Sequence, residues 1–373
     1  MKVKLGDIFE IGSGGTPVKS HPEYYNGDIP WVKTGDLKSE YLFEVEDFIT
    51  EKGLENSSAK MYEKDTVLIA MYGATIGATS ILKMSACTNQ ACAAFKKNEK
   101  VIPEYLYYFL KSKKEKFVKD GVGGAQPNIS VGYLKKTEME LLLLKEQRKI
   151  VDILDRISEM VLKRNQEIQL LDDLIKARFV ELFGMPVSNT KGWSTESMED
   201  VAPIVNYKGE FHEEVWLLNL DMVEAQTGRI IDYLIVTEDE VGNSTCTFDT
   251  SNVLYSKLRP YLNKVVIPNR CGYATSELVP LQPVNTKINR EYLAFMLRND
   301  EFVNMINEKV AGAKMPRVSM NDFRKFDVPV PPIELQNQFA DFVHQVDKSK
   351  VAVQKALDET QMLFDSLMQK YFV

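Results

Sequence analysis

The chain has 373 residues, of which 44% are hydrophobic and 27% charged, and its formal net charge is −7 at pH 7. These values describe an ordinary soluble globular protein of two or three domains. The leucine run at residues 141–144 is far too short to cross a membrane, and the N-terminus MKVKLGDIFE lacks the apolar core of a signal peptide, so we expect a cytoplasmic protein without membrane contact.

Glycines and a proline crowd the start of the chain, in VKLGDIFEIGSGGTP. Gly12, Gly14, Gly15 and Pro17 predict a tight turn, where backbone amides could approach an anion. The turn lacks the Lys-Ser/Thr pair of a P-loop, and the following HPEYYNGD does not have the pattern of a helix. We therefore expect a turn here rather than a nucleotide site.

Alternating segments then predict strands at residues 66–71, 79–82 and 91–96, with the small-residue loop MYGATIGATS between the first two. The next segment, PEYLYYFLKSKKEKFVK at residues 103–119, predicts an amphipathic helix that begins at proline. Eight lysines crowd residues 96–119. They predict a solvated face, with phosphate contact as the alternative, and a local basic face can bind phosphates on an acidic chain because salt screens distant charges.

The longest predicted element is a helix at residues 146–183. It contains no Pro or Gly, and its apolar residues recur every seven positions, which is typical of a coiled-coil seam. At about 1.5 Å per residue it would reach roughly 55 Å. The apolar seam positions are Ile150, Leu154, Ile157, Val161, Ile168, Leu171, Ile175 and Leu182. Such a seam cannot stay exposed to water, so the helix needs a partner.

The same pattern recurs 189 residues later, at the C-terminus. Gln147 corresponds to Gln336 and Phe183 to Phe372, so the register holds from end to end. The apolar seam positions of the second helix are Phe339, Val343, Val346, Val353, Leu357, Phe364, Leu367 and Tyr371. We therefore predict that the two helices pair through these seams.

Three basic residues, Arg164, Arg178 and Lys350, occupy seam positions, and Arg164 and Lys350 are equivalent in the two helices. A polar residue in a seam often fixes the register at some cost in stability. Contact with a partner subunit is the alternative. Because two facing cations would repel, we expect them to be offset or matched by acids. The candidate acids are Asp155, Glu167, Asp347 and Glu359.

The two halves of the chain repeat one plan. Trp31 and Asp36 correspond to Trp216 and Asp221 at an offset of 185 residues. The offset drifts slowly through later loops and never resets, as expected of a duplicated domain. The loops differ, however, since GAQPNIS in the first half becomes GAKMPRVS in the second. We therefore predict an α+β fold with two tandem mixed α/β domains that perform similar tasks on different targets.

Sequence signatures of catalysis are missing. The chain has no [DN]PP[YF] turn of an adenine methyltransferase, no convincing PD-(D/E)xK nuclease motif, and no GxSxG, HExxH or Walker motif. Its four cysteines form no CxxC pair and its three histidines are scattered. We therefore expect no metal site, no catalytic residue, and cysteines that are buried or incidental.

Two segments carry a family likeness. GSGGTP…YYNGDIPWVKTGDL at residues 12–37 resembles the opening of the target recognition domains in specificity (S) subunits of type I restriction–modification enzymes, and EQRKIVDIL resembles the helix that follows each such domain. The tandem order covers essentially the whole chain. The second half departs from the pattern, with APIVNYKGEF in place of the GGTP loop and Leu335 in place of the glutamate. The resemblance implies target recognition domain 1 at residues 1–145, a central helix at 146–184, target recognition domain 2 at 185–333 and a C-terminal helix at 334–373.

The resemblance implies a non-catalytic subunit that binds double-stranded DNA. Each recognition domain would read one half of a bipartite site, and the two helices, paired as an antiparallel coiled coil, would fix the length of the unread spacer. Methyltransferase (M) and restriction (R) subunits would dock on this chain. S-adenosylmethionine, ATP and Mg would belong to those partners, so no cofactor is expected in this chain.

The candidate DNA-binding residues come from loops. Lys and Arg suit phosphates or guanine, whereas Asn and Gln suit adenine. In the first domain the candidates are Ser13, Thr16, Lys33, Thr34, Tyr72, Thr75, Gln126 and Asn128, and in the second they are Asn219, Lys257, Arg259, Tyr261, Lys314 and Arg317. The alternative for each is a turn former or a solvated side chain. Trp31 and Trp216 are expected to be core anchors rather than base-stacking residues.

Two other classes of function stay open at this point. A helical scaffold whose flanking domains bind protein would show no salt-dependent binding to DNA. A methyltransferase or nuclease with an unrecognised site would bind S-adenosylmethionine or cut DNA without a partner.

Overall fold

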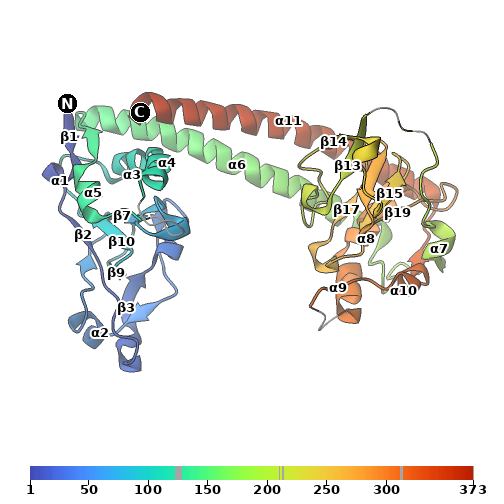
Figure 1. The fold of residues 1–373 in the computed structure, drawn as a ribbon, viewed down its shortest axis with the longest axis horizontal. Helices are drawn as coiled ribbons and strands as arrows, with labels where there is room; N and C mark the ends of the chain where they lie inside the picture. The colour runs from blue at the N-terminus through green and yellow to red at the C-terminus, as the bar shows by residue number, and fades with distance from the viewer. Residues whose placement is uncertain (122–127, 210, 212–213, 311–313, 373) are drawn as a thin grey trace. The chain divides into compact units, whose positions relative to one another are not determined.

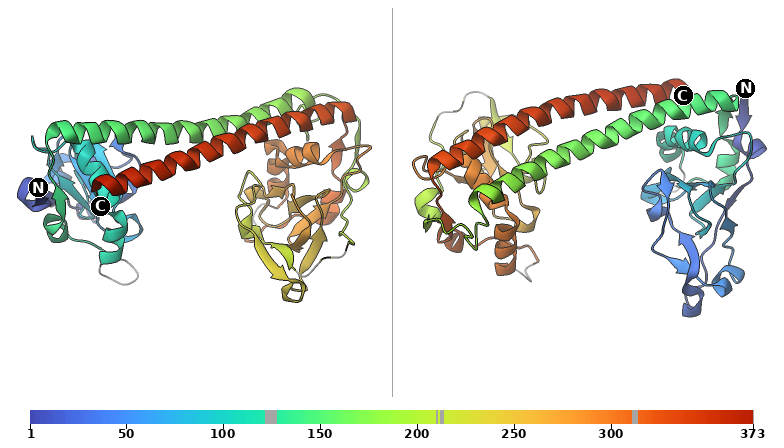
Figure 2. Two further views of the ribbon diagram at one scale, coloured as in Figure 1. Left: turned by 90° about the horizontal axis from the view of Figure 1, so that it is seen from above. Right: turned by 180° about the vertical axis from the view of Figure 1, so that it is seen from behind.

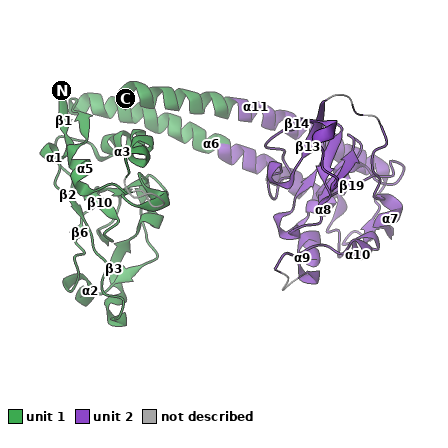
Figure 3. Cartoon of the chain, viewed as in Figure 1, with its two compact units in different colours: residues 1–164, 356–373 green, residues 165–355 purple. Residues whose placement is uncertain are grey.

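The structure is a computed structural model that describes residues 1–121, 128–209, 211, 214–310 and 314–372 (Figure 1). It divides into two compact units, Met1–Arg164 with Ala356–Val373, and Asn165–Lys355 (Figure 3). Each unit holds one mixed α/β domain and one end of each of two long helices. The predicted fold class, α+β with two tandem domains and a pair of long helices, is thereby confirmed.

The first unit contains a five-stranded sheet of order β2-β10-β7-β8-β4, a four-stranded sheet of order β5-β3-β9-β6, and the antiparallel pair β1 and β11. Its strands are β1 (Lys2–Lys4), β2 (Ile11–Ser13), β3 (Tyr25–Val32), β4 (Tyr41–Leu42), β5 (Phe48–Ile49), β6 (Met61–Tyr62), β7 (Val67–Ala70), β8 (Thr79–Leu82), β9 (Ala86–Thr88), β10 (Cys92–Phe95) and β11 (Glu138–Glu140), and its short helices include α1 (Leu5–Ile8), α2 (Glu51–Glu55) and α5 (Val131–Lys136). The three strands predicted from alternation are β7, β8 and β10. They are neighbours in one sheet, and every residue in them is buried.

The single amphipathic helix predicted in the first half is two helices, α3 (Pro103–Ser112) and α4 (Lys114–Asp120). The chain bends at Lys113, whose N–H donates to a carbonyl three residues earlier and so closes α3 with a tighter turn. Both pieces share one apolar pattern, which is why the sequence did not reveal the break. Helix α3 packs on the first long helix, and the Tyr108 hydroxyl donates to Asp155 at 2.7 Å.

The second unit repeats this plan. It contains a three-stranded sheet of order β17-β16-β19, a four-stranded sheet of order β14-β13-β18-β15, and the antiparallel pair β12 and β20. Its strands are β12 (Thr195–Ser197), β13 (Glu214–Leu218), β14 (Leu234–Thr237), β15 (Thr245–Phe248), β16 (Val253–Ser256), β17 (Val265–Val266), β18 (Gly272–Thr275), β19 (Leu278–Leu281) and β20 (Asp327–Pro329), and its helices are α7 (Met198–Val201), α8 (Arg290–Arg298), α9 (Asp300–Lys309) and α10 (Met320–Arg324).

The duplication extends to strand pairing. Strands β3 and β9 run parallel in the first unit, as β13 and β18 do in the second. Strand β7 pairs antiparallel with β8 and β10, and β16 pairs in the same way with β17 and β19. Trp31 and Trp216 occupy equivalent strands and are 5% and 2% exposed, so both belong to the core.

The two long helices are α6 (Leu144–Phe183) and α11 (Ile333–Phe372), each of 40 residues (Figure 2). In the first unit the start of α6 shares a core with the end of α11, and in the second unit the end of α6 shares a core with the start of α11. The helices therefore run antiparallel. Every seam residue predicted in both helices is buried or half-buried.

All three basic residues of the seam have partners, and Arg178 pairs with Glu181 at 2.8 Å. The Arg164 guanidinium donates to the carbonyl of Ala356. Lys350 lies 2.5 Å from Asp172 and 3.8 Å from Asp347. Of the four acids expected there, Asp347 is thus a secondary partner, and the main one is Asp172. The sequence did not identify Asp172, because it lies one position beyond the seam residue Leu171.

Candidate nucleic-acid interface

Each domain is attached to its long helix by a buried glutamine. Gln147 accepts from the N–H of Ile102 at 2.9 Å and donates to the carbonyls of Lys100 and Leu142, both at 2.9 Å. Gln336 accepts from the N–H of Asn289 at 2.9 Å and donates, at 2.9 and 2.8 Å, to two carbonyls of its own unit. Both side chains have no exposed surface. These contacts fix the N-terminal ends of α3 and α8, and with them the sheets that carry the loops.

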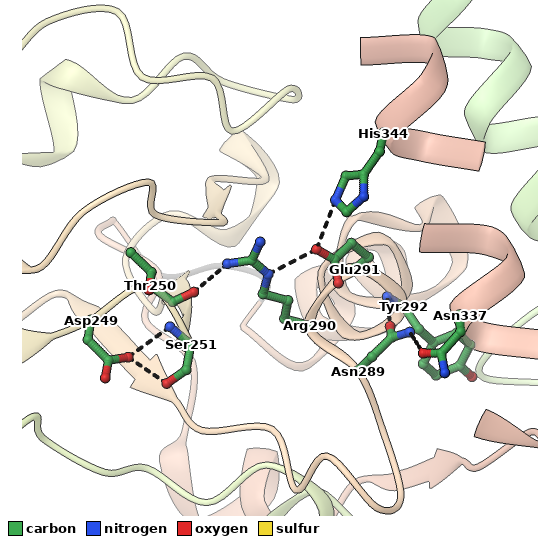
Figure 4. Close-up of polar contacts among 9 residues, drawn as sticks. All are labelled: Asp249, Thr250, Ser251, Asn289, Arg290, Glu291, Tyr292, Asn337 and His344. Atoms are coloured by element: carbon green, nitrogen blue, oxygen red, sulfur yellow. Dashed lines mark hydrogen bonds and ion pairs between the residues drawn. The ribbon is translucent and has the colours of Figure 1, made fainter. Parts of the chain in front are cut away.

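A second polar layer attaches α8 in the second unit (Figure 4). Glu291 accepts from Arg290 at 2.9 Å and lies 3.4 Å from the Nε2 of His344 on α11. Asn289 caps α8 by accepting from the N–H of Tyr292 at 2.8 Å, and its amide donates to Asn337 at 3.2 Å. The domain of the second unit and the helix α11 are therefore linked by side chains from both elements.

The candidate loops of the first unit are joined by backbone hydrogen bonds. The Met71 N–H donates to Ala91, the Ile129 N–H donates to Met71, and Tyr72 forms a β-bridge with Asn128. In the same region the Asn89 N–H donates to Val32, which places the start of the Lys33–Thr34 turn beside the β9–β10 loop. We call this group the first loop cluster, and its described candidates are Ser13, Thr16, Lys33, Thr34, Tyr72, Thr75 and Asn128.

Exposure and pairing distinguish the members of the first loop cluster. Tyr72 is 44% exposed and Asn128 is also exposed. Thr75 donates to the carbonyl of Tyr72 at 3.0 Å, so its hydroxyl stabilises the turn. Lys33 forms an ion pair with Asp47 at 2.6 Å and is therefore already neutralised. The remaining candidate of this domain, Gln126, lies outside the described residues.

The glycine turn at the start of the chain is explained by packing. A Cβ added at Gly14 would lie 1.8 Å from the carbonyl oxygen of Thr88, and one added at Gly15 would lie 2.2 Å from a serine hydroxyl. The turn thereby brings Thr16 against Gln90, to whose amide oxygen it donates at 2.5 Å. Gln90 is a further candidate residue that the sequence did not reveal, because only the fold places the β9–β10 loop beside the turn.

The second unit builds an equivalent group, the second loop cluster, around Lys257, Arg259, Glu277 and Arg317. The Lys257 N–H donates to Glu277, and the Arg259 N–H donates to Pro316 at 2.8 Å. Arg317 lies in a β-bridge with the residue between Lys257 and Arg259, and its guanidinium pairs with Glu277 at 2.7 Å. Glu277 was also missed from the sequence. Its Oε2 is buried without a hydrogen-bond partner among the described residues.

The other candidates of the second domain lie nearby or along the same chain segments. Tyr261 is 46% exposed on the turn η6 (Pro260–Leu262), which follows Arg259. Lys314 is exposed and lies close in sequence to Arg317. Asn219 is half-buried at the end of β13, where its carbonyl accepts from Met222 at 3.2 Å. That contact gives Asn219 a turn-forming role as well.

The two loop clusters share a backbone but differ in charge. The same hydrogen bonds place Lys257 where the first unit has Met71, and Glu277 where it has Ala91. The β-bridges place Arg317 opposite Leu258 in the way that Asn128 lies opposite Tyr72. The described candidates of the first cluster are neutral apart from Lys33, which pairs with Asp47, whereas the second cluster presents two arginines, a lysine and a glutamate. Such surfaces suit contacts to phosphates and to the base edges of different sequences.

In the described part of the chain, possible metal ligands are dispersed and two of the four cysteines are buried. No set of three or more His, Cys, Asp or Glu side chains there could hold a metal ion. Burial raises the pKa of Cys87 and of Cys92 to about 12, so both remain thiols at neutral pH. No helix among the described residues is long and apolar enough to cross a bilayer.

Comparison with known proteins gives a consistent result. The family model for the type I restriction modification DNA specificity domain matches residues 1–171 and 191–360. The MjaIX specificity subunit of Methanocaldococcus jannaschii is 24% identical, over 98% of this chain and 91% of that protein. The EcoDI specificity subunit of Escherichia coli is 24% identical, over 72% and 69%. The crystal structure of a type I S subunit from M. genitalium shares the fold, with a TM-score of 0.57 at 17% identity and coverage of 100% and 96%.

Proposed function

Because the chain belongs to the type I restriction modification DNA specificity family, we propose that it selects the DNA sequence on which a type I complex acts. It is a non-catalytic subunit in which each domain reads one half of a bipartite site. The observation that carries this proposal is the presence of one framework in two copies that present different side chains. Two copies of identical surface chemistry would read two identical half-sites instead.

The reading surfaces are the two loop clusters. The exposed Tyr72 and Asn128 of the first cluster provide a hydrogen-bonding surface without charge, which suits an adenine-containing half-site. Lys257 and Arg259 of the second cluster suit phosphates and guanine. The remaining candidates in each domain contact the sugar–phosphate backbone of the DNA and so position the domain on it.

The helix pair sets the length of the unread spacer. Support comes from the continuity of α6 and α11, each of 40 residues and without Pro or Gly in its interior. Each helix is about 60 Å long at the ordinary rise per residue. The apolar seam, with Arg164 and Lys350 offset from each other, fixes the register of the two helices. Inserting or deleting seven residues in both helices should therefore change the length of the spacer without changing the half-sites.

Partner subunits dock on the outer faces of the same helices. These faces expose Leu162, Leu170, Val351 and Met362, which are 57%, 66%, 71% and 62% exposed. Several large apolar side chains exposed on the same pair of helices favour a protein partner. The partners are methyltransferase and restriction subunits, which carry S-adenosylmethionine, ATP and Mg, and the complex acts on cytoplasmic DNA. A solved chain of similar fold, with a TM-score of 0.61, comes from work on complex assembly in the type I restriction–modification system.

The experiment is a genome-wide map of methylated adenines in the source strain, with and without this gene. We expect loss of one split motif, made of two short sequences around a fixed gap. An unchanged map together with salt-insensitive DNA binding by the purified chain would contradict the proposal and favour a protein scaffold, since phosphate contacts make binding fall steeply with salt.

A further inference from the structure

The turn that follows β7 and β16 has the same unusual backbone in both units. In the first unit Gly73 and Gly77 have φ angles of 65° and 81°. At the equivalent positions of the second unit, Arg259 and Asn263 have φ angles of 51° and 48°. Glycine adopts this left-handed region freely, whereas a residue with a Cβ is strained there. The second unit therefore places two side chains at positions where the fold itself favours glycine.

Asn263 has a local reason to be there. Asparagine is among the residues that best tolerate left-handed backbone, and the Asn263 amide donates to the carbonyl of Arg298 at 2.9 Å, which ties the turn to α8. Arg259 has neither property. It is exposed, and among the described residues its guanidinium forms no ion pair and donates no hydrogen bond. Strained residues cluster at sites that bind ligands. We therefore expect the Arg259 side chain to make its contact with a ligand rather than within the fold.

The direction of the side chain at this position is outward. A Cβ built on Gly73 in the first unit meets no atom of the described residues within 4 Å, and Arg259 at the equivalent position of the second unit is exposed. The neighbouring Arg317 differs, because its guanidinium is already held by Glu277 at 2.7 Å. Of the two arginines in the second loop cluster, Arg259 is thus the one whose guanidinium has no partner among the described residues.

We propose that Arg259 reads a guanine in the half-site of the second domain, an inference that rests on the proposed function. Its fork of N–H donors matches the O6 and N7 acceptors that guanine presents in the major groove. Glu277 and Arg317 are positioning residues. Their ion pair stabilises the β-bridge between Arg317 and Leu258, the residue that precedes Arg259. Gly73 has no side chain, so the first domain makes no such contact from this turn.

The test measures binding of the full chain to its split motif, once the methylation map has identified that motif, and to every single-base-pair variant of it. Arg259→Gly relieves the backbone strain, so its unfolding midpoint should stay at or above that of the wild type. The same variant should lose about 5- to 150-fold of discrimination at one G·C pair of the second half-site, with the first half-site unchanged. Arg259→Lys keeps the charge but loses the fork, and it should lose that discrimination as well. Arg229→Ala is the matched control, because it removes an equal charge from an exposed, Glu224-paired arginine of the same unit and should leave discrimination intact.

Three results would overturn the inference. Full discrimination in Arg259→Gly would mean that Arg259 reads no base. Weakening by the same factor on every sequence, with a salt slope shallower by about 1, would mean a phosphate contact. Absence of any split-motif preference in the wild-type chain would overturn the proposed function together with this inference, and that result is distinct because it appears before any variant is tested.

Discussion

The buried glutamines Gln147 and Gln336 provide a sharp test of how the domains are held. Replacing Gln336 by Met keeps the volume close to native but removes three hydrogen bonds, leaving the Asn289 N–H and two carbonyls without partners. Each buried polar group left unpaired costs about 1–3 kcal/mol. Because water can reach part of the site once α8 loosens, we expect a total loss of roughly 2–5 kcal/mol for the unit that contains the substitution.

The assay is hydrogen exchange in graded urea, followed on peptides from the two units. Gln336→Met should deprotect α8 (Arg290–Arg298) while α3 (Pro103–Ser112) keeps its protection, and Gln147→Met should do the opposite. Gln345→Met, on an exposed position of α11, is the control and should change stability by less than about 0.5 kcal/mol.

Two outcomes would refute the reasoning. If Gln336→Met were as stable as the wild type, the three hydrogen bonds would contribute nothing net to the attachment of the domain. If either variant deprotected both α3 and α8 to the same extent, the two attachments would not be independent and each glutamine would serve the whole helix pair.

Three further predictions concern the helix pair. Leu171→Asp places a charge in the half-buried seam and should lower the free energy of unfolding of the second unit in urea by about 2–4 kcal/mol. The control Leu170→Asp, at a 66% exposed position, should lower it by less than about 0.5 kcal/mol. Equal effects of the two substitutions would contradict the seam assignment. Lys350→Ala leaves half-buried Asp172 without its 2.5 Å partner and should destabilise the second unit by about 1 kcal/mol, an effect that should vanish when Asp172→Ala is added. Burial raises the pKa of Asp155, so the Asp155 carboxyl binds its proton more tightly in the folded first unit than in the unfolded chain. The stability of that unit should therefore fall as pH rises from the ordinary aspartate pKa through the raised one. Asp155→Asn, which can still accept from the Tyr108 hydroxyl, should remove that dependence, and a pH profile identical to wild type would exclude Asp155 as its source.

The long helices and the duplication were predictable from the sequence because both are periodic. A heptad seam without Pro or Gly, repeated at one offset, allows few structures other than a pair of long helices. The three central strands followed from alternation for the same reason. The break at Lys113 was not predictable, because α3 and α4 share one apolar pattern and the break depends on local hydrogen bonding.

Candidate site residues that depend on strand pairing could not be found from the sequence. Gln90 lies between β9 and β10 and meets the glycine turn only because β10 pairs with β2. Glu277 lies between β18 and β19 and meets Lys257 only because β19 pairs with β16. Their residue types carry no motif. An alignment of the two halves that matches Met71 with Lys257 could have identified Glu277, because at the same offset it replaces Ala91. In the structure it lies beside the basic residues Lys257 and Arg317.

The separation between framework and surface explains why the two halves can differ so much in chemistry. The loop clusters are held by main-chain hydrogen bonds, such as those from Met71 to Ala91 and from Lys257 to Glu277, which any side chain except proline permits. The fold therefore constrains the path of these loops but not their side chains. Arg259 shows the limit of this freedom, since its φ angle of 51° is one that the framework imposes and that glycine would satisfy without strain. The proposed contact with a guanine gives a physical reason for an arginine at this position.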